Sequence, residues 1–510
     1  MSDLPRALHD SQSSSLLPLA ERLAYDREMV RCRVAVLVLI LSVTGCTKKN
    51  PLLVCPGGTC SDPQFPFCDA DGAISGEPGT CIAVSCAPNT FVACDGDNVI
   101  TCDQVGTNYD TQHCVSGCND QLGACNACQP NMSACGADGT LHVCDAQGID
   151  TPVRCAAGCI DAPAPHCAYV SPHYLPGACD GTAQGSLNIA SDQTLDTSMD
   201  ATCNGGIVQQ IGAPDICVVR YATLSVSPTA VLRVIASTMG TNVKNRPIAF
   251  IVDGDLVIDG ELDAAARGPR SSSQSSGPGG GYVSEFNGDL STGGAGGAGF
   301  ATTGGSGGNT VADGGAQNGG AQLPNPLTSV FEGGPSSPGG GGGGVMLVSC
   351  HGTVKISGVV SLGGGGGISG YISTFCFPGS GGGAGGSLLV EGMNVEITGS
   401  LFANGGGGGA GCAPGTQATS DQHGADGPLS DTTAAAGGIA VTGAGSGGAG
   451  GIGPNAPGDG RRSTVSGDHP GGGGGSIGWL QVGVPNGVTP SVTPLHASPP
   501  VQVDVPVSVR

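Results

Sequence analysis

The amino-acid sequence predicts a mainly β protein in which small disulfide-rich modules precede a right-handed parallel β-helix, or solenoid, with long glycine-rich insertions. Three observations support this fold class. The 510 residues include 95 glycines and 35 prolines but only 4% aromatic side chains, which is too few large apolar groups for an ordinary core. A unit of six cysteines occurs twice, and a nine-residue strand pattern occurs three times. The structural alternative is a β-sandwich with disordered glycine-rich loops.

The N-terminal segment has the features of a secretory signal peptide. Arg31 and Arg33 precede the apolar run "VAVLVLILSV", and the small residues of "VTGC" follow it and end at Cys46. A run this short does not span a bilayer, which needs about 20 residues. We therefore assign residues 1–45 to a signal peptide with translation starting at Met29, and an uncleaved anchor is the alternative.

The "VTGC" sequence resembles the lipobox of bacterial lipoproteins. This resemblance implies that Cys46 is acylated on its thiol, with palmitate as a typical group, and becomes the first residue of the mature chain. Residues 46–54 would then form a lipidated linker. With Thr47 after the cysteine, the resemblance also implies sorting to the outer membrane of a bacterial cell envelope.

Cysteine usage predicts an oxidising compartment. The chain has 24 cysteines, and setting aside Cys32 in the signal and Cys46 leaves an even number that can pair completely. Residues 55–81 form a four-cysteine module, and residues 86–125 and 128–167 form two copies of a six-cysteine repeat. The spacing leaves the connectivity open for the cysteines that we expect to form disulfides: Cys55, Cys60, Cys68, Cys81, Cys86, Cys94, Cys102, Cys114, Cys118, Cys125, Cys128, Cys135, Cys144, Cys155, Cys159 and Cys167.

Each repeat is too small to bury an adequate apolar core, so crosslinks substitute for one. The alternating segments "NVITC" and "LHVC" predict a short strand before the third cysteine of each copy. "CNAC" (Cys125 to Cys128) has redox spacing but crosses the repeat boundary, and no histidine recurs as a zinc ligand would. "DADG" and "DGDN" begin like calcium loops but lack the terminal glutamate, so we interpret them as turns. We expect no metal and no cofactor.

Residues 179–484 are predicted to form the solenoid. Alternation places Leu256, Ile258, Leu262 and Ala264 on one face, and such units stack because none can bury its face alone. Upstream of each unit stands another short apolar segment, so one turn of the solenoid holds three strands. Residues 485–510 are expected to be a Pro/Val-rich tail. The repeated pattern, with a shared central glycine, is "LVIDGELDA" (256–264), "VKISGVVSL" (354–362) and "VEITGSLFA" (395–403).

The glycines lie in insertions between these units, at residues 268–344, 363–386 and 405–475. One interpretation is a flexible linker. The other is a polyglycine-II array, in which chains with three residues per turn pack closely because no side chains intervene. Cys376 and Cys412 lie in different insertions, and we expect a disulfide between them. The "DQHGAD" segment (421–426) is interpreted as polar filler rather than as a metal site.

The sequence contains no strong signal for catalysis. The formal charge of -22 argues against nucleic acid as a partner, and no GxSxG, HExxH or P-loop motif occurs. Some β-helix proteins cleave acidic polysaccharides with clustered carboxylates. Alternation already requires polar residues on the outer face, however, so no catalytic residue is assigned. The residues of this chain that could form such a cluster are Asp253, Asp255, Asp259, Glu261 and Asp263, with the basic residues Arg267 and Arg270 nearby.

The arrangement as a whole resembles uncharacterised bacterial surface lipoproteins that join Cys-rich modules to a Gly-rich β-helical region. That resemblance implies surface display. The leading hypothesis is a lipid-anchored cell-surface protein with a non-enzymatic structural, adhesive or binding role. Its partners would be the membrane, through the lipid on Cys46, and an extracellular glycan or surface protein. The alternative is a β-helix carbohydrate-active enzyme, a lyase or hydrolase acting on extracellular glycans.

Overall fold

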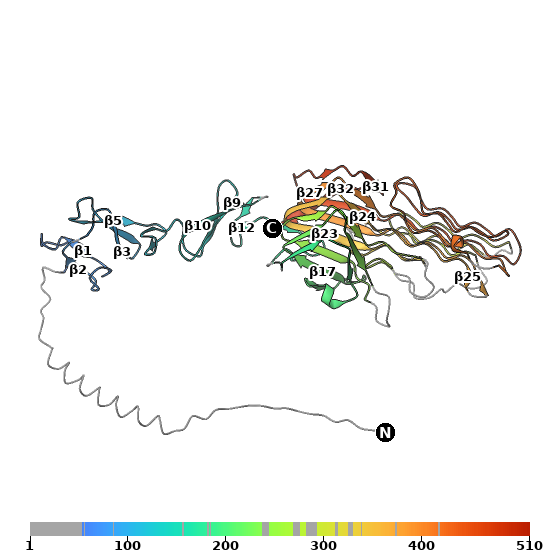
Figure 1. Cartoon of the computed structure of the whole chain (residues 1–510), viewed down its shortest axis with the longest axis horizontal. Helices are drawn as coiled ribbons and strands as arrows, with labels where there is room; N and C mark the ends of the chain where they lie inside the picture. Colours follow the sequence, from blue (N-terminus) through green and yellow to red (C-terminus); the bar gives the residue numbers. More distant parts are fainter. Residues whose placement is uncertain are drawn as a thin grey trace, which may run out of the picture. The chain divides into compact units, whose positions relative to one another are not determined.

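The computed structural model (Figure 1) describes residues 54–55, 57–84, 86–155, 158–180, 183, 185–236, 244–268, 276–281, 293–311, 315–324, 330–337, 339–372, 375–416 and 419–510. The predicted signal peptide, Met29 and Cys46 lie outside these residues. The chain divides into two compact units: one ends at Met132 and includes Cys144–Asp150, and the other comprises Ser133–Val143 and Thr151–Arg510. The described residues contain no α-helix, only the short 3-10 turns η2 (Asp200–Thr202) and η4 (Ser420–Gln422).

The cysteine-rich modules consist of small antiparallel sheets. The strands predicted before the third cysteine of each repeat are confirmed as β4 and β9. The second copy repeats the strand order of the first, with a three-stranded sheet followed by a two-stranded one. The strands are β1 (Phe67–Asp69), β2 (Thr80–Ile82), β3 (Phe91–Asp95), β4 (Asn98–Cys102), β5 (Tyr109–His113), β6 (Cys118–Asn119), β7 (Ala124–Cys125), β8 (Ser133–Cys135), β9 (Thr140–Cys144), β10 (Asp150–Arg154), β11 (Cys159–Ile160) and β12 (His166–Cys167).

The disulfide pairing is the same within each of the two six-cysteine repeats. In each copy the first cysteine pairs with the third, the second with the fifth and the fourth with the sixth. These crosslinks stabilise each repeat without a large apolar core, and both copies use the same pairing. The pairs are Cys55–Cys68 and Cys60–Cys81 in the four-cysteine module, Cys86–Cys102, Cys94–Cys118 and Cys114–Cys125 in the first repeat, and Cys128–Cys144, Cys135–Cys159 and Cys155–Cys167 in the second.

The rest of the second unit stacks parallel strands in three columns, which the chain visits in the same order on each pass. The first column contains β17 (Ile216–Tyr221), β20 (Ile248–Val252), the first parts of β23 (Gly344–Ile356) and β27 (Ser387–Ile397), and β29 (Trp479–Pro485). The second contains β14 (Ser186–Ile189), β18 (Thr223–Val226), β21 (Leu256–Ile258), the ends of β23 and β27, and β30 (Ser491–Val492). The third contains β15 (Gln193–Asp196), β19 (Val231–Ile235), β22 (Glu261–Asp263), β24 (Val359–Ser361), β28 (Ser400–Phe402) and β31 (His496–Ser498).

The first two columns belong to one large curled mixed sheet, and the third column is a separate parallel sheet. The mixed sheet has antiparallel edges, because β16 (Gly206–Val208) pairs with β17, and β13 (Val170–Ser171) pairs with β32 (Gln502–Val509). The three copies of the sequence pattern stack in register, with Leu256 opposite Val354 and Val354 opposite Val395.

The core lies between the columns. The predicted inward face is confirmed, since Leu256, Ile258, Leu262 and Ala264 are fully buried in one cluster with their counterparts from the other passes. Alternation produces this result because successive side chains of a strand point to opposite faces.

The C-terminal tail expected at residues 485–510 is instead part of the sheets, and the prediction was wrong there. Strands β30 and β31 complete a last pass, and β32 pairs in parallel with β29. Val505 and Val507 are buried. A valine stands at every second position from Val501 to Val509, which is the alternation of a strand, and Pro506 falls between two of these valines and is itself paired within β32.

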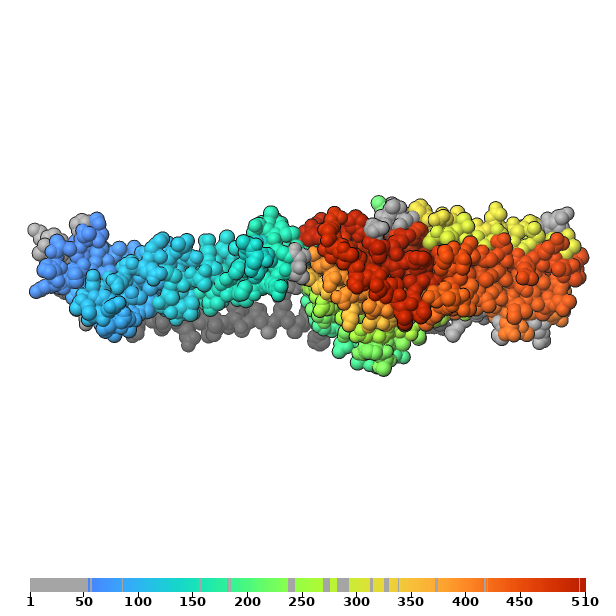
Figure 2. All heavy atoms as spheres, turned by 90° about the horizontal axis from the view of Figure 1, so that it is seen from above, coloured from blue at the N-terminus to red at the C-terminus, as the bar shows by residue number. Residues whose placement is uncertain are grey.

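The glycine-rich insertions leave the third column and return to the first, and we call the described residues of 293–343, 363–386 and 403–478 the glycine layer. In Figure 2 the yellow and orange residues of this layer lie side by side. Its described residues contain one short hairpin, β25 (Tyr371–Ile372) with β26 (Phe375–Cys376), and the 3-10 turn η4. Its backbone groups nevertheless pair systematically with one another.

Residues 403–412 lie at the centre of the glycine layer. Their N–H groups donate in three directions in rotation, so residues three apart contact the same neighbouring segment. Gly405, Gly408 and Gly411 donate to Gly451, Gly448 and Gly445, Gly406 and Gly409 donate to Gly383 and Ser380, and Gly407 and Ala410 donate to Ala425 and Gln422. Their carbonyl groups accept from three further segments, namely 364–370, 469–478 and the one containing Gly438. Six hydrogen-bonded neighbours make this a two-dimensional array rather than a sheet.

The close approach of these segments requires glycine. A Cβ atom on Gly408 would lie 2.1 Å from the carbonyl oxygen of Gly472, and one on Gly406 would lie 2.1 Å from that of Gly365. At Gly315, on the exposed edge of the layer, a Cβ atom would meet nothing within 4 Å. The centre of the layer therefore excludes side chains for steric reasons, whereas its edge does not.

Candidate functional site

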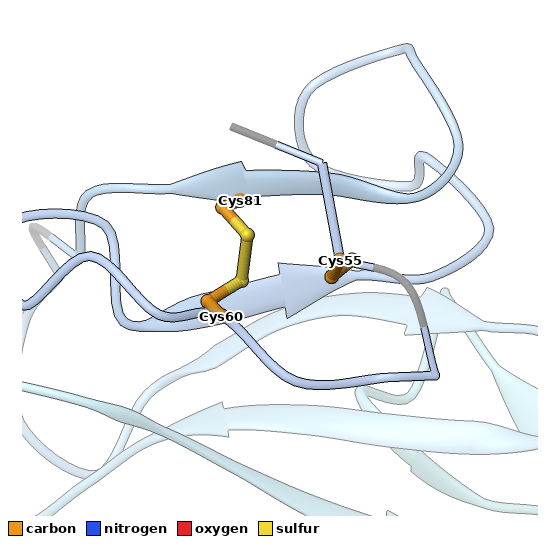
Figure 3. A group of neighbouring side chains, drawn as sticks. All are labelled: Cys55, Cys60 and Cys81. Atoms are coloured by element: carbon orange, nitrogen blue, oxygen red, sulfur yellow. A yellow bond between two sulfur atoms is a disulfide. The ribbon is translucent and has the colours of Figure 1, made fainter. Parts of the chain in front are cut away.

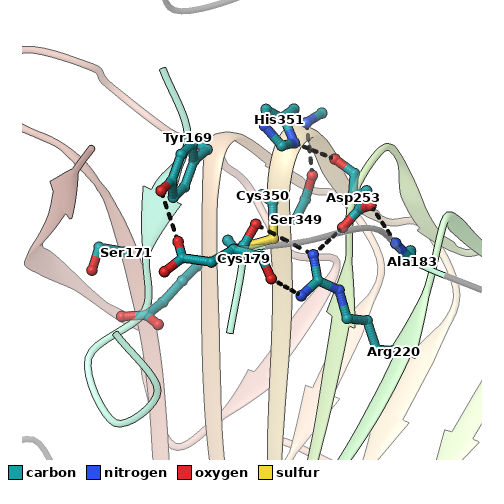
Figure 4. Close-up of a disulfide and its surroundings, with 12 residues drawn as sticks. Tyr169, Ser171, Cys179, Ala183, Arg220, Asp253, Ser349, Cys350 and His351 are labelled. Atoms are coloured by element: carbon teal, nitrogen blue, oxygen red, sulfur yellow. Dashed lines mark hydrogen bonds and ion pairs between the residues drawn. A yellow bond between two sulfur atoms is a disulfide. The ribbon is translucent and has the colours of Figure 1, made fainter. Parts of the chain in front are cut away.

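A strap of residues 168–180 follows the last cysteine of the second repeat and is fixed to the mixed sheet by a disulfide, Cys179–Cys350 (Figure 4). The pair spans 171 residues of sequence and joins the strap to β23. Val170 and Leu175 of the strap are buried against the outer face of the sheet. The strap therefore covers apolar surface that the strand pattern leaves on that face.

Polar contacts surround the disulfide. The Arg220 guanidinium pairs with Asp253 at 2.9 Å and donates to the backbone carbonyls of Cys179 and Asp180. The Tyr169 hydroxyl donates to an Asp180 carboxylate oxygen at 2.7 Å. Hydrogen bonding to Asp180 raises the pKa of Tyr169, because ionising the phenol would end its donation to the carboxylate. Figure 4 shows these side chains converging on the end of the strap.

A buried carboxylate provides a second attachment of the strap. Glu391, in β27, is fully buried and accepts from the backbone N–H of His173 at 3.2 Å and from its Nδ1 at 2.8 Å. The hydrogen bond to Glu391 raises the pKa of His173, so the imidazolium form is favoured beside the carboxylate. Burial raises the pKa of the neighbouring Tyr174.

A cleft of about 690 Å³ opens beside the strap. It is lined by rings and by a few polar groups, among them Arg154, His166, Tyr169, Asp180 and His351. Tyr169 lies between the two imidazoles, with ring centroids 5.4 Å and 5.6 Å away. Mixed apolar and polar walls of this size are typical of sites for small polar ligands. All but one of its lining residues lie between Leu141 and Asp180, and His351 of β23 joins them only in the fold, so the sequence alone did not reveal the site.

The carboxylates considered for catalysis are held by structural partners. Asp253 pairs with Arg220, Asp255 accepts the Thr353 N–H at 2.9 Å, and Asp259 accepts the Ser357 hydroxyl. Asp253 and Asp255 lie in the connection between β20 and β21, and Asp259 lies in the connection between β21 and β22.

The other charged residues considered for catalysis lie near the end of β22, where Asp263 is the centre of an ion-pair cluster. Asp263 is buried and pairs with both Arg233 and Arg267. Glu261 is half buried, and burial raises its pKa. Arg270 lies outside the described residues. The cluster balances charge at the start of an insertion, which is a structural role.

The potential metal ligands are also bonded within the protein. Among the residues that the structure describes, one trio of potential ligand atoms lies within 4.8 Å, and it consists of Cys55, Cys60 and Cys81 (Figure 3). Cys60 is bonded to Cys81 and Cys55 to Cys68. Metals bind thiolates, so these disulfide sulfurs are not a metal site.

The "DQHGAD" segment fastens the glycine layer. Asp426 accepts the N–H groups of Gly268 and Gly366, both at 2.9 Å, and His423 accepts the Ser369 N–H at 3.0 Å. Burial raises the pKa of Asp426 and lowers the pKa of His423. The segment is therefore more than filler, because its side chains satisfy backbone donors of other insertions.

The described residues contain eleven disulfides, including one between Cys376 and Cys412, as the sequence led us to expect. The pairs Cys179–Cys350 and Cys203–Cys217 were not foreseen. So many crosslinks indicate an extracellular or otherwise oxidising compartment. Within the described ranges, no helix has the length and apolar character needed to cross a bilayer. No family model matches the chain, and comparisons with curated proteins and with solved structures found no similar protein.

Proposed function

We propose that this protein is a lipid-anchored bacterial surface protein with a non-enzymatic structural, adhesive or binding role. In this proposal Cys46 holds the chain to the outer membrane, the disulfide modules act as spacers or binding units, and the second unit is presented outward. Support comes from the lipobox-like "VTGC" and from the eleven disulfides, which suit an oxidising location.

We further propose that the three columns form a right-handed parallel β-helix and that the glycine layer is a polyglycine-II array. The observation that carries the proposal is the central segment 403–412, whose hydrogen bonds rotate among six neighbours with a period of three residues. Polyglycine II has three residues per turn. Such an interior consists of backbone alone, so it supplies rigidity and no catalytic side chains.

The cleft beside the strap supports a binding role rather than a purely structural one. Its rings and polar groups would suit a sugar or another small polar ligand. The competing function, cleavage of acidic polysaccharides, is less well supported because the carboxylates of Asp253, Asp255 and Asp263 are held in structural contacts. Unsaturated products from acidic polysaccharides incubated with the mature protein would favour the enzyme.

The anchor is tested by replacing Cys46 with serine. We expect Cys46→Ser to release the protein from membranes and to abolish labelling by a fatty-acid probe, because serine offers no thiol for acylation. Cys32→Ser, within the signal peptide, is the matched control and should leave both properties unchanged. Labelling that persists in Cys46→Ser would refute the lipid anchor.

A further inference from the structure

Two acidic turns of the first unit are brought together by the fold. The "DADG" turn follows β1, and Asp95 ends β3 at the start of "DGDN". The N–H of Asp71 donates to an Asp95 carboxylate oxygen at 3.1 Å. A Cβ atom on Gly96 would lie only 2.9 Å from a carboxylate oxygen of Asp71. Each turn alone lacks the ligands of a calcium loop, but together they bring Asp71, two residues after Asp69, into contact with Asp95.

Two of these carboxylates are buried. Asp69 is 0% exposed and Asp95 is 6% exposed. One Asp69 oxygen accepts the N–H groups of Ile74 and Ser75, whereas its other oxygen, Oδ1, has no hydrogen-bond partner among the described residues. A buried carboxylate without a cation carries a large desolvation cost, and such groups are normally paired or bind a metal.

Among the described residues, no cationic side chain pairs with them. Between Pro51 and Val153 the sequence contains twelve Asp and Glu residues and neither Lys nor Arg. A cation from solution would supply the missing compensation.

We propose that Asp69, Asp71 and Asp95 bind a calcium ion at the junction of the two turns. Calcium accepts six to eight oxygen ligands in a flexible geometry, whereas magnesium demands a near-ideal octahedron. No three carboxylates lie within 4.8 Å of one another in the described chain, so binding requires the side chains of the two turns to move closer together. A site of this kind resembles weak extracellular modules, with a dissociation constant of about 0.1–1 mM.

Terbium is a suitable probe because it replaces calcium and is excited through nearby tyrosine. Tyr109 packs on Phe67 with ring centroids 4.8 Å apart, and Phe67 is in the same strand as Asp69. The mature chain with Cys46→Ser should give tyrosine-sensitised terbium emission that millimolar calcium displaces. Calcium, compared with chelator or with magnesium, should also raise its thermal midpoint.

Single substitutions distinguish calcium binding at this site from binding to the acidic surface in general. We expect Asp69→Asn to abolish both effects, and Asp71→Asn, whose side chain is exposed, to fold normally and to weaken calcium binding by about 10-fold to 100-fold. Asp103→Asn removes the same charge from the same unit and should bind calcium as the parent does. No calcium-dependent shift in the parent, or unchanged binding in Asp71→Asn, would overturn the proposal. The site is independent of the anchor, so either idea can fail alone.

Discussion

Replacing Gly408 with alanine should strongly destabilise the second unit, because the glycine layer has no room for a methyl group at this position. The new Cβ atom would lie 2.1 Å from the Gly472 carbonyl oxygen and 2.7 Å from that of Gly473, whereas ordinary contacts begin near 3.4 Å. Segment 469–478 would have to move by about 1 Å or more. Such overpacking alone costs about 1–3 kcal/mol.

The displacement would also break hydrogen bonds. Segment 469–478 donates to the central segment through the N–H groups of Gly472 and Gly475, which bond the carbonyl groups of Gly409 and Gly406. Each buried backbone group left unpaired costs about 1–3 kcal/mol. The expected loss for Gly408→Ala is therefore at least about 3 kcal/mol, a large fraction of the stability of an ordinary domain.

Urea unfolding followed by tryptophan fluorescence measures this loss directly. Trp479 is the only tryptophan in the chain, and it follows segment 469–478 and packs against the Phe300 and Ala384 cluster. Gly315→Ala is the matched control and should stay within about 0.5 kcal/mol of the parent, because nothing lies near its Cβ position. Equal stabilities for Gly408→Ala and Gly315→Ala would refute close packing of the layer.

Two further predictions concern the strap. His173→Ala leaves the buried Glu391 carboxylate without its ionic partner, and because solvent screens the exposed His173 we expect a loss of about 1–3 kcal/mol in urea unfolding at acidic pH. Because the pKa of His173 is raised in the folded chain, its stabilisation is complete below its unfolded pKa of about 6.5 and declines as the pH rises through the folded pKa. Replacing both Cys179 and Cys350 with alanine removes a crosslink across 171 residues, worth about 5 kcal/mol by chain entropy, and should lower the thermal midpoint.

Each strap prediction has its own control. The stability of the parent should change with pH between the unfolded and the folded pKa of His173, and this change should disappear in His173→Ala. A stability profile identical to that of the parent would mean that another group causes the pH dependence. The Cys203–Cys217 pair spans only 14 residues, so its removal should cost about 3 kcal/mol. Equal or greater loss from that shorter crosslink would contradict the chain-entropy argument.

The strands were predictable because their information is local. Alternation around Gly260, Gly358 and Gly399 fixes which side chains face inward, and a shift of one residue would expose all of them. The same logic found β4 and β9 in the repeats. The valines at every second position of residues 501–509 carry the same signal for β32, whereas its pairing with β29 is supplied only by the fold.

The candidate sites were less predictable because they depend on distant pairings. Cys179 and Cys350 lie in segments with no shared pattern, and Glu391 meets His173 across 218 residues. The calcium-like turns were set aside because each is incomplete within its own loop. Asp71 and Asp95 become neighbours only when the four-cysteine module packs on the first repeat within the first unit.

The glycine layer contains a signal with a period of three residues that strand alternation does not reveal. Along the outer segment 303–309, Thr303 and Asn309 are exposed and Ser306 is half buried, while Gly305 and Gly308 are buried. In a helix with three residues per turn, every third side chain points the same way. A segment open on one side can therefore carry a side chain at one position in three.

The same relation holds at the centre of the layer, where the central segment has no side that is open to solvent. Gly405 to Gly409 are consecutive glycines because segment 403–412 is enclosed on all sides by backbone. The spacing of non-glycine residues thus reports how many sides of a segment are covered. In the proposed polyglycine-II array one turn takes three residues, so three added residues lengthen a segment by one turn without changing which residues face each neighbour.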